Sequence, residues 1–136
     1  MTSDEVVAAA RETLGTPFRH QGRAIGVGLD CAGVAIYVAS RLGFEPSDVI
    51  GYGETPANGQ LERMIEEQGY LEEVDSRQPG DLLLMRILGE PQHVAICAGE
   101  TMIHSYASVE RCCEHDIGER WESRIVKVYR FIGVTL

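Results

Sequence analysis

Apolar residues in the first half of the chain recur at helical spacing in three stretches. One such face runs through residues 4–14, which Ser3 can cap, and its inner positions are Val6, Val7, Ala10 and Leu14. A second runs through residues 31–42, directly after Asp30, whose carboxylate suits an N-cap. A third, shorter face covers residues 61–68. The first half is therefore predicted to be mainly helical.

The second half alternates between apolar and polar positions over short runs, which is the pattern of half-buried strands. The runs cover residues 70–75 (a brief strand or turn), 81–87, 92–98, 101–105 and 125–131. Residues 107–122 are polar and poorly periodic, and no element is predicted there. Helices followed by an antiparallel meander give the fold class α+β.

Two stretches hold too much glycine and proline for regular elements. Residues 15–30 are rich in glycine and contain Pro17, which predicts a loop that brings backbone close to another part of the protein. A flexible connector is the alternative interpretation. Residues 44–58 carry two prolines and two glycines and are predicted to be irregular.

Length limits the number of domains, and net charge limits the classes of partner. The 136 residues are predicted to form one domain, residues 1–136. A formal net charge of -9 and a single lysine, Lys127, disfavour nucleic acid and anionic membranes as partners. The N-terminus lacks the basic and apolar regions of a secretory signal, and no apolar run is long enough to span a membrane. We therefore expect the chain to be cytoplasmic as synthesised.

The four cysteines, at positions 31, 97, 112 and 113, do not form the pattern of a disulfide framework. No C-x-x-C pair is present, and the group of Cys112, Cys113 and His115 matches no standard zinc spacing. The sequence therefore predicts no metal site and no cofactor.

Cys31 falls at the first position of a predicted helix, where the helix dipole favours an anion. A thiol placed there beside an imidazole can have a pKa well below about 8.5, which is how a cysteine nucleophile is made. The alternative is a structural cysteine buried ahead of an apolar run.

His93 and His104 lie on consecutive predicted strands joined at Gly99. A hairpin closed around Gly99 would place position 93 roughly opposite 104 or 105, so that one imidazole can orient the other. Together with Cys31 they would supply the nucleophile, base and orienting group of a cysteine acyl-transfer enzyme. Two histidines that serve only the packing of a hairpin are the alternative.

Five motifs, in order along nearly the whole chain, resemble the NlpC/P60 family of cell-wall peptidases. They are Leu14-Gly15-Thr16-Pro17-Phe18, Gly28-Leu29-Asp30-Cys31-Ala32-Gly33-Val34, Pro79-Gly80-Asp81-Leu82-Leu83, His93-Val94-Ala95-Ile96 and Met102-Ile103-His104. Residues 17–23 look like the phage-associated or tail-associated branch, whose members reach the wall within a particle or through lysis.

The resemblance implies a papain-like fold, with the cysteine helix packed on an antiparallel sheet. It implies hydrolysis of an amide in peptidoglycan stem peptides, typically γ-D-glutamyl to meso-diaminopimelate, through a thioester acyl-enzyme. Cys31 matches the nucleophile, His93 the general base and His104 the third, orienting residue. Stem peptides, and phage-tail or tail-like particle proteins, are the partners that it implies.

Three positions depart from the common family pattern. Phe18 stands where a tyrosine is common, His20 where a tryptophan is frequent, and Ala32 where a serine usually follows the cysteine. Because the tyrosine hydroxyl lies near the oxyanion, His20 or Gln21 is a candidate for the missing donor. Phe18 and His20 can also simply pack the loop.

Two charged residues complete the set of substrate-binding candidates, together with Phe18 and His20. By resemblance Asp30 faces the cleft and binds a stem-peptide amine, although capping alone explains it. Arg23 is a candidate partner for a substrate carboxylate, or a solvated loop residue.

Two other functions stay open. The same residues would serve an amidase or acyltransferase with a substrate outside the wall. A structural or assembly protein of a phage-like tail would keep the fold with little catalysis, an interpretation that Phe18 and Ala32 favour and the intact Cys31, His93 and His104 disfavour.

Overall fold

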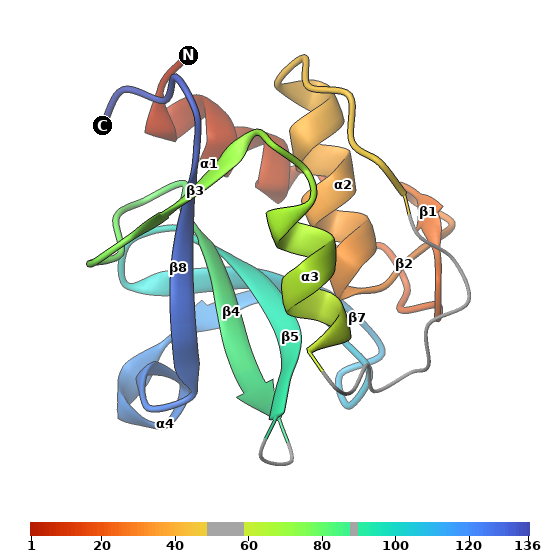
Figure 1. Ribbon diagram of the computed structural model, residues 1–136. Coiled ribbons are helices and arrows are strands. Elements are labelled where there is room, and N and C mark those ends of the chain that lie inside the picture. Colours follow the sequence, from red (N-terminus) through yellow and green to blue (C-terminus); the bar gives the residue numbers. More distant parts are fainter. Residues whose placement is uncertain (49–58, 88–89) are drawn as a thin grey trace.

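The structure, a computed structural model, describes residues 1–48, 59–87 and 90–136. Helices α1, α2 and α3 cover one face of a six-stranded antiparallel sheet, which confirms the α+β class (Figure 1). The helices are α1 (Ser3–Arg11), α2 (Cys31–Arg41), α3 (Gln60–Glu66) and α4 (Gly118–Glu122). The sheet strands are β3 (Leu71–Val74), β4 (Leu82–Ile87), β5 (Glu90–Cys97), β6 (Thr101–Tyr106), β7 (Arg111–Asp116) and β8 (Ile125–Phe131).

The strand order is β3-β8-β4-β5-β6-β7. Strands β4 to β6 form the predicted meander and β7 extends it, while β8 returns to pair with both β4 and β3. Strand β8 begins and ends at the predicted residues, 125 and 131.

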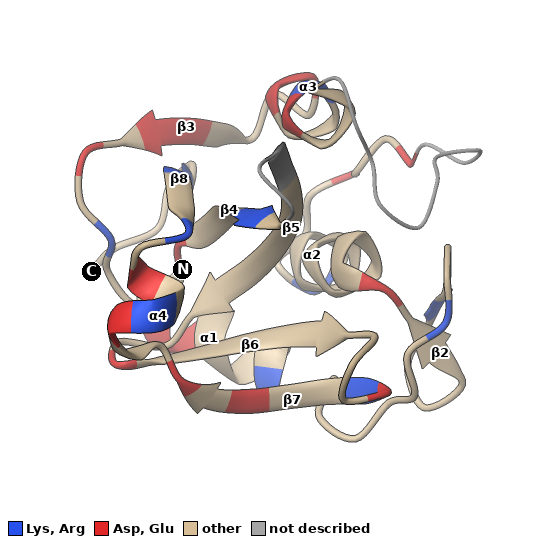
Figure 2. Cartoon of the chain, turned by 90° about the horizontal axis from the view of Figure 1, so that it is seen from below, with Lys and Arg blue, Asp and Glu red and all other residues tan. Residues whose placement is uncertain are grey.

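The charged residues are mixed rather than segregated. Acidic residues on α3, β3, α4 and β7 lie among basic ones, with no continuous basic stripe in this view (Figure 2).

The two faces of the sheet bury different sets of side chains. On the helix side, Val94 and Ile96 of β5 and Ile103 of β6 pack against α1, α2 and α3. On the opposite side a smaller cluster is covered by α4 and contains Leu83, Met85, Ala95, Met102 and Ile117. Side chains alternate along a strand, so His93 and His104 fall on this second side.

Three local predictions are wrong. Helix α1 is capped by Thr2, whose hydroxyl accepts the Glu5 backbone N–H at 3.2 Å, so Ser3 is already helical. Leu14 is exposed, and Thr13 is buried beyond the end of α1 in its place. Residues 107–122 contain β7 and α4, which the polar pattern concealed because β7 is an edge strand and α4 covers the smaller cluster.

The glycine-rich residues 15–30 do bring backbone close to another element, as predicted. The expectation of no regular element there is wrong, because the chain forms a small hairpin of β1 (Arg23–Ala24) and β2 (Gly28–Leu29) that lies against the start of α2. A Cβ atom on Gly33 of α2 would lie 2.3 Å from the Gly22 carbonyl oxygen. Only glycine at position 33 therefore allows this approach.

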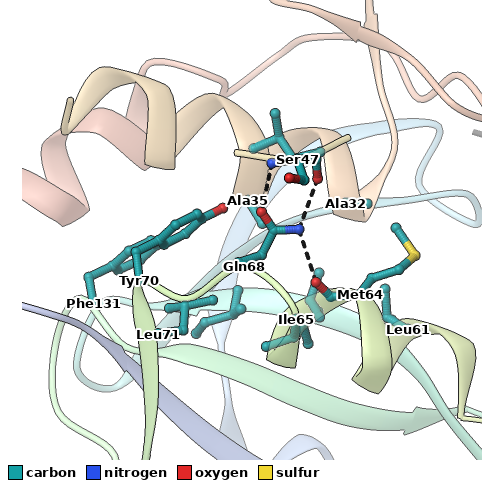
Figure 3. A pocket seen from close by; sticks show the side chains of 13 residues that line it. Ala32, Ala35, Ser47, Leu61, Met64, Ile65, Gln68, Tyr70, Leu71 and Phe131 are labelled. Atoms are coloured by element: carbon teal, nitrogen blue, oxygen red, sulfur yellow. Dashed lines mark hydrogen bonds between the residues drawn. The ribbon is translucent and has the colours of Figure 1, made fainter. Parts of the chain in front are cut away.

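A small apolar cavity of about 40 Å³ lies between α2, α3 and the sheet (Figure 3). At its edge Gln68 binds both the N–H and the carbonyl of Ser47, which ties the segment after α2 to α3. The stacked rings of Phe44, Tyr70 and Phe131 close the same region. Residues 44–48 form no regular element, as predicted, and the rest of that prediction, residues 49–58, lies outside the described residues.

Among the described residues, none of the helices has the length and apolar character needed to cross a membrane.

Candidate active site

Cys31 is the first residue of α2, and Asp30 is its N-cap, as predicted. Oδ1 of Asp30 accepts the Gly33 backbone N–H at 2.8 Å, and Oδ2 accepts the Gln21 backbone N–H at 2.9 Å. Arg23 donates to Oδ1 at 2.9 Å and also forms an ion pair with Asp48. Asp30 therefore joins the loop, the hairpin and the helix at the residue beside the thiol.

We expect Asp30→Ala to lower the free energy of unfolding by about 2 kcal/mol, because α2 loses its cap and Arg23 loses a buried partner. Asp30→Asn keeps a good cap and loses only the charge, so its cost is expected to be smaller. Urea titrations followed by circular dichroism measure both variants. Equal losses in the two would show that capping contributes nothing.

The two imidazoles are in direct contact, with His93 Nε2 and His104 Nδ1 2.6 Å apart. The predicted register, with position 93 opposite 104 or 105, is nevertheless wrong by one or two residues. Ile96 pairs with Ile103 and Cys97 with Met102, and continuing that register puts Tyr106 opposite position 93. His104 is then the diagonal neighbour on the same face, still within reach of a ring. Both histidines are buried.

Cys31 and His93 both line a pocket of about 230 Å³. It opens where β5 and β6 diverge, beyond the paired residues 96–97 and 102–103, and its lining includes Cys31 and His93. Phe18, His20 and Asp30 also line it, while Arg23 and Gln21 are not among the lining residues. Arg23 is held by Asp30 and Asp48 instead, and substrate binding by these residues stays a prediction.

The surroundings of Cys31 oppose ionisation of its thiol. Burial raises the pKa of Cys31 to about 12, and the Asp30 carboxylate adds to this rise. The backbone N–H groups of Val94 and Ala32 lower the same pKa, but by less. Burial also lowers the pKa of His93 to about 4. The prediction of a depressed thiol pKa is therefore wrong, and at neutral pH the Cys31 thiol and the His93 imidazole are both uncharged.

We expect alkylation of Cys31 by iodoacetamide to accelerate about tenfold per pH unit between roughly pH 7 and 10, because the thiolate fraction rises throughout that range. Peptide mass spectrometry of the Cys31 peptide gives the rate at each pH. Free cysteine in the same buffers, with a pKa of about 8.5, levels off within this range. An alkylation rate of Cys31 that levels off below about pH 9 would mean that its thiol has a low pKa, as predicted from the sequence.

A third imidazole, from β7, extends the histidine pair. His104 Nε2 lies 2.8 Å from His115 Nε2, and the rings of Tyr106 and Trp121 flank His104 at 5.3 and 5.4 Å. From the sequence, His115 is a candidate only for metal binding, and no role is predicted for Trp121. The strand register explains the contact, since Cys113 pairs with His104 and His115 is two residues further on the same face.

Within residues 1–48, 59–87 and 90–136, the group that could hold a metal is His104, Cys113 and His115, whose ligand atoms lie within 4.8 Å of one another. Two nitrogens bound to one tetrahedral zinc at about 2.0–2.1 Å would be about 3.3 Å apart. The 2.8 Å between the Nε2 atoms is a hydrogen-bond distance instead. As they stand, these residues do not fit a metal ion.

Residues 15–130 match the model of the NlpC/P60 family. The chain belongs to this family. A search of curated proteins finds no match.

Solved structures of other NlpC/P60 proteins share the fold. The NlpC/p60 domain of the peptidoglycan hydrolase SagA is 24% identical with a TM-score of 0.66, over 97% of this chain and 100% of that one. An NlpC/P60 protein from Bacillus cereus is 21% identical with a TM-score of 0.72, over 97% of this chain but 41% of the other. The peptidoglycan hydrolase RipB from Mycobacterium tuberculosis is 16% identical with a TM-score of 0.65, over 96% and 64%.

These similarities establish the papain-like NlpC/P60 fold for residues 15–130. They do not distinguish the phage-associated branch, which stays a prediction from residues 17–23.

Proposed function

We propose that the protein is a cysteine endopeptidase that hydrolyses an amide bond in peptidoglycan stem peptides. One observation carries this proposal: Cys31, at the N-terminus of α2, and His93, bonded to His104, line the same pocket within an NlpC/P60 domain. The similarity to the peptidoglycan hydrolases SagA and RipB supports the substrate class.

Because the thiol and the imidazole rest neutral, the proton moves as the bond forms. Cys31 Sγ attacks the scissile carbonyl carbon while His93 accepts the thiol proton. The backbone N–H of Cys31, at the positive end of α2, faces the developing oxyanion. His93 then donates its proton to the leaving amine, and the carbonyl stays on Sγ as a thioester. A water molecule, deprotonated by His93, releases the new carboxylate and restores the thiol.

The finer substrate is proposed to be the γ-D-glutamyl to meso-diaminopimelate bond. Asp30, Phe18 and His20 line the pocket and are the candidate contacts for the stem peptide. Of the two candidates for a further oxyanion donor, we favour His20, since His20 lines the pocket and Gln21 does not. Arg23 would act through its ion pair with Asp30.

The test compares purified muropeptides with generic acyl esters and amides as substrates of the intact chain. Muropeptides are expected to be cleaved with a kcat/KM at least about 100-fold above that for the simple acyl donors, because remote contacts contribute to the transition state. The reverse preference would favour an amidase or acyltransferase that acts outside the wall. No turnover of either class would favour a structural role.

Association with a phage-tail or tail-like particle is a separate proposal that rests on residues 17–23 alone. Copurification of the chain with tail components tests it, and a chain found only outside particles would contradict it.

A further inference from the structure

Three imidazoles from neighbouring strands form a continuous chain that ends on a backbone carbonyl. His93 Nε2 lies 2.6 Å from His104 Nδ1, and His104 Nε2 lies 2.8 Å from His115 Nε2. His115 Nδ1 lies 2.8 Å from the Asp116 carbonyl oxygen. Adjacent rings meet edge-on, at interplanar angles of 78° and 71°, so neither pair is stacked.

The Asp116 carbonyl at the end of this row of imidazoles determines which nitrogen donates in each hydrogen bond. A carbonyl oxygen accepts and cannot donate, so His115 Nδ1 must carry a hydrogen. In the neutral form of His115 this is the ring's one N–H, which leaves His115 Nε2 as an acceptor. His104 must then donate from Nε2 and accept at Nδ1, and His93 must donate from Nε2. The one nitrogen left without a hydrogen is His93 Nδ1.

We propose that His115 is a positioning residue that, held by the Asp116 carbonyl, fixes the tautomers of His104 and His93 and keeps His93 Nδ1 free to accept the Cys31 proton. Its catalytic meaning rests on the proposed function, in which His93 is the base. The opposite tautomer of His93 would carry a hydrogen on Nδ1 and could not take the thiol proton.

The environment keeps the first two imidazoles, His93 and His104, dry and neutral. His104 is fully buried between the rings of Tyr106 and Trp121, and Arg124 stacks over Trp121 at 4.7 Å. Burial lowers the pKa of His93 to about 4 and that of His104 to about 2. At neutral pH each of these two rings therefore has one hydrogen, as the assignment requires.

The direct test is long-range ¹H–¹⁵N NMR of the imidazoles in the ¹⁵N-labelled intact protein near neutral pH. Protonated Nε2 and unprotonated Nδ1 are expected at His93 and His104, and the reverse at His115. A protonated Nδ1 at His93 would overturn the proposal. This readout does not depend on hydrolysis, so it can fail while muropeptides are cleaved, or succeed while they are not.

Two variants separate positioning from packing. His115→Leu removes the acceptor, so both tautomers of His93 become populated, and kcat should fall by the fraction of His93 that shifts, about twofold for equal populations, with KM unchanged. The loss stays far below the roughly 10⁴-fold cost of a wholly wrong tautomer. His115→Gln offers an amide oxygen as acceptor and should restore most of kcat. A single His93 tautomer retained in His115→Leu would overturn the proposal, and the wild-type spectrum still decides if that variant does not fold.

Zinc titration of the wild-type protein tests the competing use of the same atoms. A metal ion held by His104, Cys113 and His115 through the two facing Nε2 atoms needs a lone pair on each of them, which is the opposite proton arrangement at His104. Unchanged His104 and His115 signals at one equivalent of zinc support the tautomer chain. Binding with both Nε2 atoms unprotonated would overturn it in favour of a metal site.

Discussion

Cys31→Ala is expected to lower the rate of muropeptide cleavage by about 10⁶-fold, the order of loss seen when a triad nucleophile is removed. Alanine keeps the helix start and the Asp30 cap while deleting the single atom that forms the thioester. The variant should fold normally, because a small side chain at a half-buried position is shortened. Timed digests separated by liquid chromatography give the rate.

A matched thiol variant shows whether the loss is specific. Cys97 is a fully buried cysteine on the opposite side of the sheet, and Cys97→Ala should retain nearly wild-type activity. If Cys31→Ala kept more than about one per cent of the activity, Cys31 would not be the nucleophile.

His93→Ala is expected to cost a similar factor, about 10⁶, and the double variant with Cys31→Ala should be no slower than either single one. The nucleophile and its base act as one unit, so the losses do not add. Initial rates for the four proteins complete a double-mutant cycle. Losses that multiplied in the double variant would show that the two residues act independently.

The dependence of kcat/KM on pH in the wild-type protein tests the protonation state of His93 independently. Since the pKa of His93 is lowered to about 4, the unprotonated base is present above that pH and lost as pH falls through it. We expect kcat/KM to stay nearly constant from about pH 6 to 9 and to decline toward pH 4. An acidic limb near pH 7 would mean that His93 is not held in a dry site.

Helix α2 and strand β8 could be predicted from the sequence because their signals are local. A capping aspartate beside an apolar face defines the start of α2, and alternating residues define β8. Strand β7 could not be predicted, because an edge strand with polar residues on both faces has no alternation to detect. Its place became evident only through its pairing with β6.

The features of the site likewise divide into those that the sequence predicted and those that it could not. Spacing and motif order brought out Cys31, His93 and His104, but the thiol pKa depends on how much water the fold removes. Burial outweighs the helix N-terminus here, and no local pattern reports burial by distant strands. The contact of His115 with His104 likewise depends on the β6–β7 register, which the sequence did not define.

The central claim, that Cys31 and His93 hydrolyse stem peptides, is tested most directly by identifying the new chain ends. A muropeptide containing the γ-D-glutamyl to meso-diaminopimelate bond is incubated with wild type, Cys31→Ala and Cys97→Ala, and the products are sequenced by tandem mass spectrometry. We predict a free γ-carboxylate on glutamate and a free diaminopimelate amine with wild type and Cys97→Ala only. An intact muropeptide with wild type, or equal cleavage by Cys31→Ala, would contradict the claim.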